Sequence, residues 1–123
     1  MGIDFGSKRV GVALSHDEGK IGMPYSVITN DRDLLSNILK IIKEEDVNKV
    51  VVGESKDFKG EPNKIMQKAE VFIDELIKAG VEVVLEPEFL STFQAERWQG
   101  KNENIDASAA AIILQSYLDR ETR

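Results

Sequence analysis

The spacing of hydrophobic residues changes along the chain and predicts strands first, then helices that alternate with strands. Apolar residues alternate with smaller ones over Arg9–Ser15, a period of two that is typical of a strand. A short apolar segment around Asp4 precedes this strand, and Ile21–Ile28 is expected to return beside it after a polar turn. Helical spacing begins after Asn30. The first quarter of the chain therefore predicts an antiparallel meander.

Two amphipathic helices are expected in the middle of the chain. The first would begin after a cap at Asn30 or Asp31, and the second would stop at Gly80. Their apolar faces comprise Leu34, Leu35, Ile38, Leu39, Ile41 and Ile42 in the first helix, and Ile65, Ala69, Phe72, Ile73 and Leu76 in the second. Each helix precedes a short strand that is typical of burial on both faces, over Val47–Gly53 and Val81–Leu85.

The last third predicts a short helix from Ser91 or Thr92 and a final helix over Ala107–Leu118. Strands joined by hairpins, followed by strands separated by helices, indicate an α/β domain with a mixed five-stranded sheet. We expect residues 1–123 to form a single domain, because no repeat, low-complexity tract or linker interrupts them.

Composition narrows the classes of function. The formal net charge of −6 does not favour broad electrostatic binding of nucleic acid, although a metal-assisted nuclease can be acidic because its own site is acidic. The absence of cysteine excludes disulfides, thiolate zinc sites and cysteine nucleophiles. No apolar run approaches the ~20 residues needed to span a membrane, so we expect no membrane partner. These features are compatible with a cytoplasmic protein.

Several carboxylates fall at the ends of predicted elements. Asp4 lies on the first strand, Glu54 follows the fourth, Glu86 and Glu88 follow the fifth, and Asp106 starts the final helix. The carboxyl ends of parallel strands meet at one edge of a sheet, where ligands usually bind. Such acids repel one another unless cations neutralise them, and hard cations such as Mg²⁺ prefer oxygen ligands. The pattern suggests metal-assisted phosphodiester cleavage.

Each acid also has a simpler structural interpretation. Asp4 could accept backbone hydrogen bonds at a strand end. Asp106 could be the N-cap of the alanine-rich final helix. Glu54 and Glu88, taken singly, could be solvated loop acids. Spacing alone therefore does not establish that these side chains converge.

Cations and hydroxyls near the same edge could contact a substrate. Lys8 and Arg9 follow the first strand and could contact phosphates, although solvated surface charge is the simpler interpretation. Ser91 and Thr92 most simply cap a helix. The other cations that flank this edge are Lys56, Lys59, Lys64, Arg97 and Lys101.

Four motifs in order resemble the YqgF/RuvX family, which is described as Holliday junction resolvases or pre-16S rRNA nucleases. The motifs are Gly2-Ile-Asp-Phe-Gly-Ser-Lys-Arg-Val-Gly-Val-Ala13, Val50-Val-Val-Gly53, Leu90-Ser-Thr92 and Asp106-Ala-Ser-Ala-Ala-Ala-Ile-Ile-Leu-Gln-Ser-Tyr-Leu-Asp119. The resemblance implies an RNase H-like fold with helices on both faces of the sheet. It also implies a nuclease that uses Mg²⁺ or Mn²⁺ and matures the 5′ end of small-subunit ribosomal RNA in the cytoplasm.

By position, Asp4 matches the first-strand aspartate of the family and Asp106 its C-terminal aspartate. The middle acid departs from the family pattern. Pro87-Glu88-Phe89 stands where the family usually has Asp-Glu-Arg, and Gly53-Glu54-Ser55 stands where it usually has Gly-Leu-Pro. We therefore hypothesise that Glu54 contributes to the metal site and compensates for the altered segment, with Glu88 as the other candidate. Ser91 and Thr92 of the third motif are assigned to substrate binding.

The leading hypothesis is a metal-dependent nuclease acting on pre-rRNA, with Asp4 and Asp106 holding the metal and Lys8 or Arg9 orienting the phosphate backbone. The first alternative is a Holliday junction resolvase, which would cleave branched DNA as a homodimer with two active sites. The second is a non-catalytic RNA- or ribosome-binding module that has lost its metal. The first motif also resembles the phosphate loop of actin-like kinases, but those need two such lobes.

Overall fold

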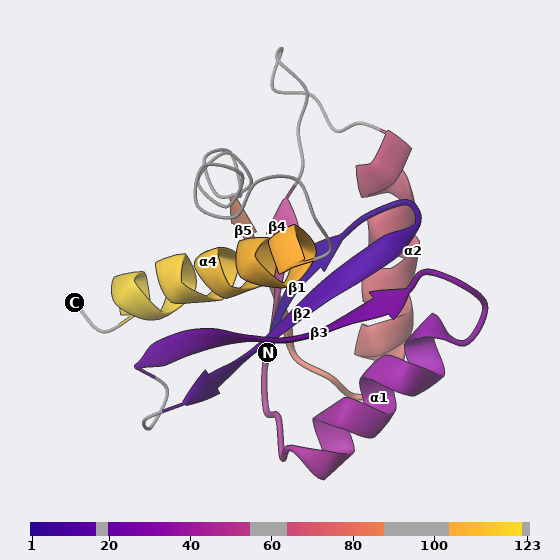
Figure 1. Cartoon of the computed structure of the whole chain (residues 1–123). Coiled ribbons are helices and arrows are strands. Elements are labelled where there is room, and N and C mark those ends of the chain that lie inside the picture. Colours follow the sequence, from indigo (N-terminus) through magenta and orange to yellow (C-terminus); the bar gives the residue numbers. More distant parts are fainter. Residues whose placement is uncertain (17–19, 55–63, 88–103, 122–123) are drawn as a thin grey trace.

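The structure, a computed structural model, describes residues 1–16, 20–54, 64–87 and 104–121 (Figure 1). Its strands are β1 (Gly2–Phe5), β2 (Arg9–His16), β3 (Ile21–Thr29), β4 (Val50–Glu54) and β5 (Val83–Pro87). Its helices are α1 (Leu34–Glu44), α2 (Lys64–Lys78) and α4 (Asn104–Glu121). The strands form one sheet in the order β3-β2-β1-β4-β5. The first three pair antiparallel and β1, β4 and β5 pair parallel, which confirms the expected mixed five-stranded sheet.

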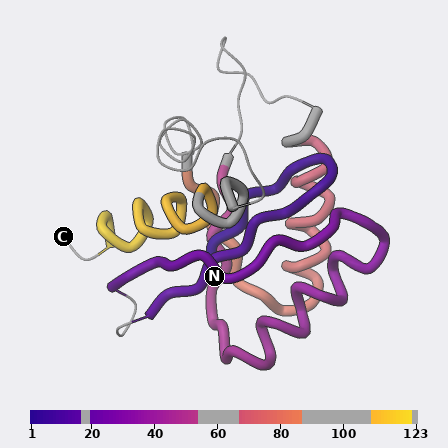
Figure 2. Tube along the Cα trace, viewed as in Figure 1, coloured from indigo at the N-terminus to yellow at the C-terminus, as the bar shows by residue number. Residues whose placement is uncertain are grey.

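Helices cover both faces of the sheet, as Figure 2 shows, with α4 on one face and α1 and α2 on the other. The α1–α2 face buries the larger core, to which alternate residues of β1, β2 and β4 contribute together with the predicted apolar face of α1 and four predicted residues of α2. These four are Ala69, Phe72, Ile73 and Leu76, whereas the side chain of Ile65 lies outside the part of the structure that is described. The α4 face buries a smaller core around Ala110, Ile113 and Leu114. Among the described helices, none is long and apolar enough to cross a membrane.

Strands β4 and β5 begin later than the sequence pattern predicts, and for the same reason. Val47 donates its N–H to the carbonyl of Ile42 at 2.9 Å, and Val81 donates to the carbonyl of Leu76 at 3.0 Å. Each bond closes the end of the preceding helix in a Schellman motif. The N–H of each valine is therefore already paired with the helix, and the strand starts only after it. A carbonyl of the preceding helix, rather than a neighbouring strand, thus receives the N–H of each valine.

Both helices end on a residue with a left-handed backbone. Gly80 ends α2 with φ 89°, whereas Asp46 occupies the equivalent position after α1 with φ 53°. Glycine adopts this conformation without steric cost, but a residue with a Cβ does so at a penalty. The two helices therefore end in the same backbone conformation. In α2 glycine occupies this position without strain, whereas in α1 an aspartate occupies it with strain.

We expect Asp46→Gly to raise the free energy of unfolding by about 0.5–1 kcal/mol, since it removes the strain at the end of α1. Gly80→Ala should lower the same free energy by about 1 kcal/mol. A Cβ at Gly80 would meet nothing within 4 Å, so the loss reports backbone conformation alone. Urea unfolding with an unchanged m-value measures both effects, and a destabilised Asp46→Gly would contradict this account.

The amino end of α1 differs from the prediction that Asn30 or Asp31 caps it. The helix starts at Leu34 with Asp33 in the N-cap position, and Asp33 makes no side-chain capping bond. The Asp31 carboxylate instead accepts the Asp33 N–H at 2.9 Å, within the turn that precedes the helix. The Asn30 side chain reaches across to the carbonyl of Gly6. The polar residues before α1 therefore organise the loop, and Asn30 ties it to a different part of the chain.

Candidate metal centre

Asp4 projects from β1 onto the face of the sheet that α4 covers. Its neighbours Ile3 and Phe5 belong to the core on the α1–α2 face, whereas Gly2 packs against α4. Because successive side chains of a strand point to opposite faces, Asp4 shares the α4 face with Gly2. Asp4 is only half-buried. The predicted carboxylate therefore lies on the sheet surface nearest the final helix, within reach of water.

Two glycines flank Asp4 within the sheet. Gly11 lies directly opposite it in the antiparallel register of β1 and β2. On the other side, Ile3 pairs with Val52, and one further residue of that parallel register brings Gly53 beside Asp4. The sheet thus carries no side chain on either side of the carboxylate. This space and the hard oxygen donor fit Mg²⁺ or Mn²⁺, since Mg²⁺ keeps several of its waters.

Helix α4 runs from the carboxyl edge of the parallel strands toward their amino edge. Gln115 accepts the Gly22 N–H at 2.8 Å and donates to the Lys20 carbonyl at 3.0 Å. Gly22 pairs with Ser15, which lies beyond the amino end of β1. On the side of β3 the second half of α4 is therefore at the amino edge, and the first residues of the helix lie toward the carboxyl edge, as Figure 1 shows.

A close contact between β1 and α4 lies near both Asp4 and Asp106 along the chain. A Cβ built on Gly2 would lie 2.7 Å from both the Ala110 carbonyl and the Leu114 Cβ, so helix and strand are in close contact there. Asp4 is two residues beyond Gly2, about 6.6 Å along the strand. Asp106 is one helical turn before Ala110, about 6 Å along the helix in the same direction. The two predicted metal ligands thus both lie on the carboxyl side of this contact, Asp4 on β1 and Asp106 on α4.

The alternative role of Asp106 as an N-cap is wrong. Helix α4 begins at Asn104, so Asp106 is the third residue of the helix. The predicted start at Ala107 was late because the polar residues Asn104 and Asp106 hide the helical pattern in the sequence. The Asp106 side chain lies outside the part of the structure that is described, and its role as a metal ligand stays a prediction.

Polar contacts hold the second half of α4 on the sheet. Lys49, just before β4, donates to the Tyr117 hydroxyl at 2.8 Å and pairs with Glu82 at 3.2 Å. The hydrogen bond to Tyr117, followed by that to Glu82, raises the pKa of Lys49 to about 12. Arg120 also lies over the Tyr117 ring, at 5.8 Å from its centroid. These contacts oppose sliding of α4, on which the position of Asp106 depends.

Glu86 belongs to this anchor, although the register of the parallel strands places it in the same row of the sheet as Gly53 and Asp4. The sequence pattern places it after the fifth strand among the candidate acids, but it lies inside β5 and is only 4% exposed. It accepts a hydrogen bond from Ser116 at 3.1 Å and forms an ion pair with Arg120. A buried carboxylate needs such partners, and α4 supplies both of them. Its contacts also show that this position of β5 faces α4.

The third metal ligand stays a prediction. Glu54 is the last residue of β4, at the strand end where it was expected. By strand alternation position 54 belongs with Val50 and Val52, which pack in the core on the opposite face from Asp4. Glu88 lies outside the described residues. Among the side chains that the structure describes, no three acids or histidines form a metal site.

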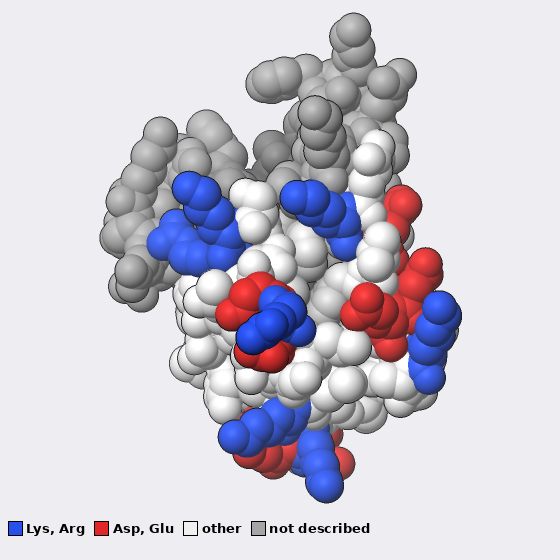
Figure 3. Space-filling model, turned by 90° about the vertical axis from the view of Figure 1, so that its right-hand side faces the viewer, with Lys and Arg blue, Asp and Glu red and all other residues white. Residues whose placement is uncertain are grey.

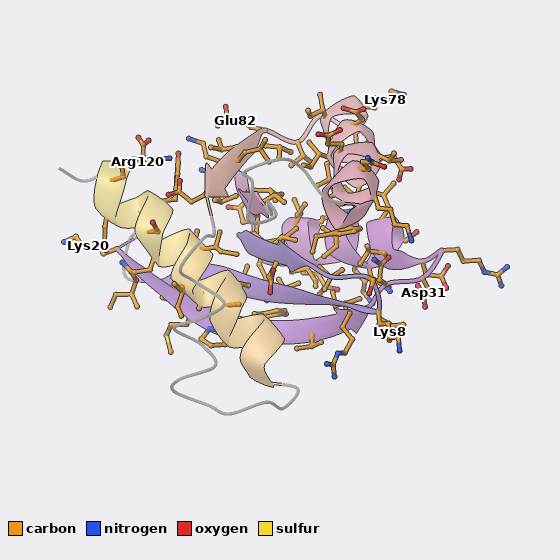
Figure 4. The ribbon with its side chains drawn as sticks, turned by 90° about the horizontal axis from the view of Figure 1, so that it is seen from above. Lys8, Lys20, Asp31, Lys78, Glu82 and Arg120 are labelled. Atoms are coloured by element: carbon orange, nitrogen blue, oxygen red, sulfur yellow. The ribbon has the colours of Figure 1, made fainter. Side chains whose placement is uncertain are left out.

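The predicted substrate-binding cations lie on the turn between β1 and β2. Lys8 and Arg9 are both exposed. Arg9 alternates with Gly11 and Ala13 along β2, which places it on the Asp4 face. Figure 4 shows Lys8 at the opposite end of the sheet from Lys20 and Arg120. The predicted substrate residues Ser91 and Thr92 lie outside the described ranges, as do Lys56, Lys59, Arg97 and Lys101.

A cleft of about 440 Å³ opens beside the same turn, between the loop before α1 and helix α2. Its charged lining balances Arg32 and Lys68 against Asp31 and Glu75. Figure 3, which views the molecule from the α1–α2 end, likewise shows positive and negative side chains interspersed among the described residues. A polyanion gains little from such a surface. The cations at the β1–β2 turn are therefore better placed to meet a phosphate backbone than those in the cleft.

Comparisons with known proteins identify the family of this chain. Residues 1–120 match the family model described as RuvX, Holliday junction resolvase. A protein of Sulfurihydrogenibium sp. named "Putative pre-16S rRNA nuclease" is 33% identical, with 98% of this chain and 89% of the relative covered. One of the same name from Anaeromyxobacter sp. is 39% identical, with 97% and 95% covered.

Solved structures show the same fold. The RuvC of Thermus thermophilus in complex with a Holliday junction substrate superposes with a TM-score of 0.64 at 16% sequence identity. The superposition covers 98% of this chain and 93% of that chain. A second structure of Thermus thermophilus RuvC gives a TM-score of 0.61 at 14% identity, covering 98% of this chain and 94% of that one. The expected RNase H-like fold is thereby confirmed.

Proposed function

Because the chain belongs to the RuvX family of Holliday junction resolvases, we propose that it is a divalent-metal-dependent nuclease that processes the 5′ end of pre-16S rRNA in the cytoplasm. The observation that carries the proposal is Asp4, held between two glycines on the sheet face opposite the first turns of α4, where Asp106 lies. The names of the relatives favour an RNA precursor as the substrate.

In this mechanism Asp4 and Asp106 would hold Mg²⁺ or Mn²⁺, and Glu54 or Glu88 would complete the ligand set. When bound, the metal supplies an activated water and stabilises the leaving oxygen of the phosphodiester. Arg9, on the Asp4 face, and Lys8, on the adjoining turn, would orient the backbone and neutralise its charge. Gly11 and Gly53 leave the scissile phosphate room to approach Asp4.

Two single substitutions identify the third ligand. We expect Glu88→Gln to weaken Mn²⁺ binding by at least about 10-fold and Glu54→Gln to change it less than about twofold. The reason is that position 54 alternates with Val50 and Val52, which pack in the α1–α2 core, whereas Asp4 lies on the α4 face. Calorimetric titration with Mn²⁺ measures both variants. The reverse order of effects would assign Glu54 to the site.

A cleavage assay tests the proposed function. Purified protein is incubated with Mg²⁺ and an end-labelled RNA that spans the 5′ end of 16S rRNA and its leader. We expect cleavage in the leader, and none when the metal is chelated. An immobile four-way DNA junction serves as the competing substrate. Cleavage of neither substrate would contradict the proposal.

The likeness to RuvC favours one second candidate, a Holliday junction resolvase. Such an enzyme must cut two strands symmetrically, so this alternative requires a homodimer with paired active sites. Solution mass measured at the assay concentration, together with the junction assay, separates the two functions. A dimer that cuts the junction symmetrically and leaves the RNA intact would replace the proposed function.

A further inference from the structure

Asn30 holds the turn between β1 and β2 with two hydrogen bonds. Its side-chain amide donates to the carbonyl of Gly6 at 2.7 Å, and its backbone N–H donates to the carbonyl of Lys8 at 2.9 Å. The contacts link residues 24 and 22 positions apart in sequence, from the loop after β3 to the turn. Figure 4 shows Lys8 and Asp31, the neighbour of Asn30, at the same end of the sheet.

The turn itself leaves little freedom. A Cβ at Gly6 would lie 2.5 Å from the carbonyl of Arg9, so only glycine fits between the two strand ends. Asn30 takes the two carbonyls that frame Ser7, one before it and one after it. The half-buried side chain of Asn30 thus fixes the start of the turn at Gly6, and its backbone N–H fixes the end at Lys8. Without the amide donor, the Gly6 carbonyl would depend on water.

The cations of the proposed substrate contact belong to this segment. Lys8 lies within the turn and Arg9 directly follows it, and both side chains are exposed. Long cationic side chains pay rotamer entropy on binding, which a mobile backbone would increase. A fixed turn therefore presents both charges to a phosphate backbone at a smaller entropic cost.

We propose that Asn30 is a positioning residue that sets the affinity for nucleic acid by fixing the turn that carries Lys8 and Arg9. The inference rests on the proposed nuclease function and deepens it. Asn30 acts through the two cations and does not ligate the metal. Its loss should therefore weaken substrate binding while leaving Mn²⁺ binding unchanged.

A double-mutant cycle tests this role by fluorescence anisotropy with a labelled RNA of the 16S leader and Ca²⁺ in place of Mg²⁺. We expect Asn30→Ala to weaken binding about fivefold in the wild-type background and less than about 1.5-fold in the Lys8→Ala/Arg9→Ala background. Asn37→Ala is the matched control, since Asn37 is exposed on α1, and it should leave affinity unchanged. The Mn²⁺ affinity of Asn30→Ala should stay within twofold of wild type.

Amide hydrogen exchange supplies a readout that does not depend on substrate. Asn30→Ala should speed exchange over residues 6–10 and leave α2 unchanged. If Asn30→Ala does not fold, Asn30→Ser, whose hydroxyl is too short for the same contact, takes its place in the cycle.

Each outcome decides between the two proposals. Wild-type protein that neither binds nor cuts nucleic acid overturns the proposed function and this inference with it. Wild-type cleavage combined with equal losses from Asn30→Ala in both backgrounds overturns the inference alone. Unchanged exchange over residues 6–10 also overturns it.

Discussion

Asp4→Asn is expected to lower metal-dependent cleavage by about three orders of magnitude or more, because it removes the charge of a principal metal ligand. Asparagine keeps the size of the side chain and, at a half-buried site, should leave the fold intact. Single-turnover cleavage of the 16S leader RNA measures the loss, and circular dichroism with urea unfolding checks the fold.

A matched substitution distinguishes this loss from a general effect of charge. Asp74 is exposed on α2, on the other side of the sheet from Asp4, so Asp74→Asn changes the net charge equally without touching the site. We expect wild-type cleavage from it. Retained activity in Asp4→Asn, or an equal loss in Asp74→Asn, would argue against metal ligation by Asp4.

Gly2→Ala is expected to lower both stability and activity, because it pushes α4 away from β1. The new Cβ would lie 2.7 Å from the Ala110 carbonyl, a backbone atom that moves only with the helix. Overpacking of this kind costs about 1–3 kcal/mol of the free energy of unfolding. A displacement of about 1 Å between Asp4 and the turn carrying Asp106 should reduce the cleavage rate about 100-fold.

Gly80→Ala is the control for Gly2→Ala. It makes the same change of residue at the end of α2, where a Cβ meets nothing, so it should lose stability without moving α4. Cleavage rates compared at a temperature where both variants are fully folded separate geometry from stability. Equal rates in the two variants would show that the contact at Gly2 does not set the active geometry.

The element order and the mixed sheet could be predicted because period-two and helical spacing persist over whole elements. The boundaries could not, since Val47 and Val81 have the apolar character of strand residues but donate to the helices behind them. Gly80 was recognised as a stop from its residue type. Asp46, which adopts the same backbone conformation, carries no such signal.

A residue of the candidate site could be predicted from sequence where its own charge or polarity indicates its role. It could not be predicted where its role depends on which distant residues the fold places beside it. Asp4 can be recognised in the sequence as a charge in an apolar strand. Its flanking glycines cannot be recognised, because only strand pairing brings them beside it. Glu86 resembles an edge acid until α4 brings Ser116 and Arg120 onto it. Asn30 could be interpreted from sequence only as a helix cap, because its partner lies 24 residues away.

Titration calorimetry with Mn²⁺ on wild-type protein, Asp4→Asn, Asp106→Asn and the double variant tests most directly whether one metal joins β1 to α4. The account predicts uptake by the wild type, a loss of at least about 10-fold in affinity in each single variant, and little further loss in the double variant. Asp4→Asn that binds Mn²⁺ as tightly as the wild type would contradict the account, as would a wild type that takes up no metal.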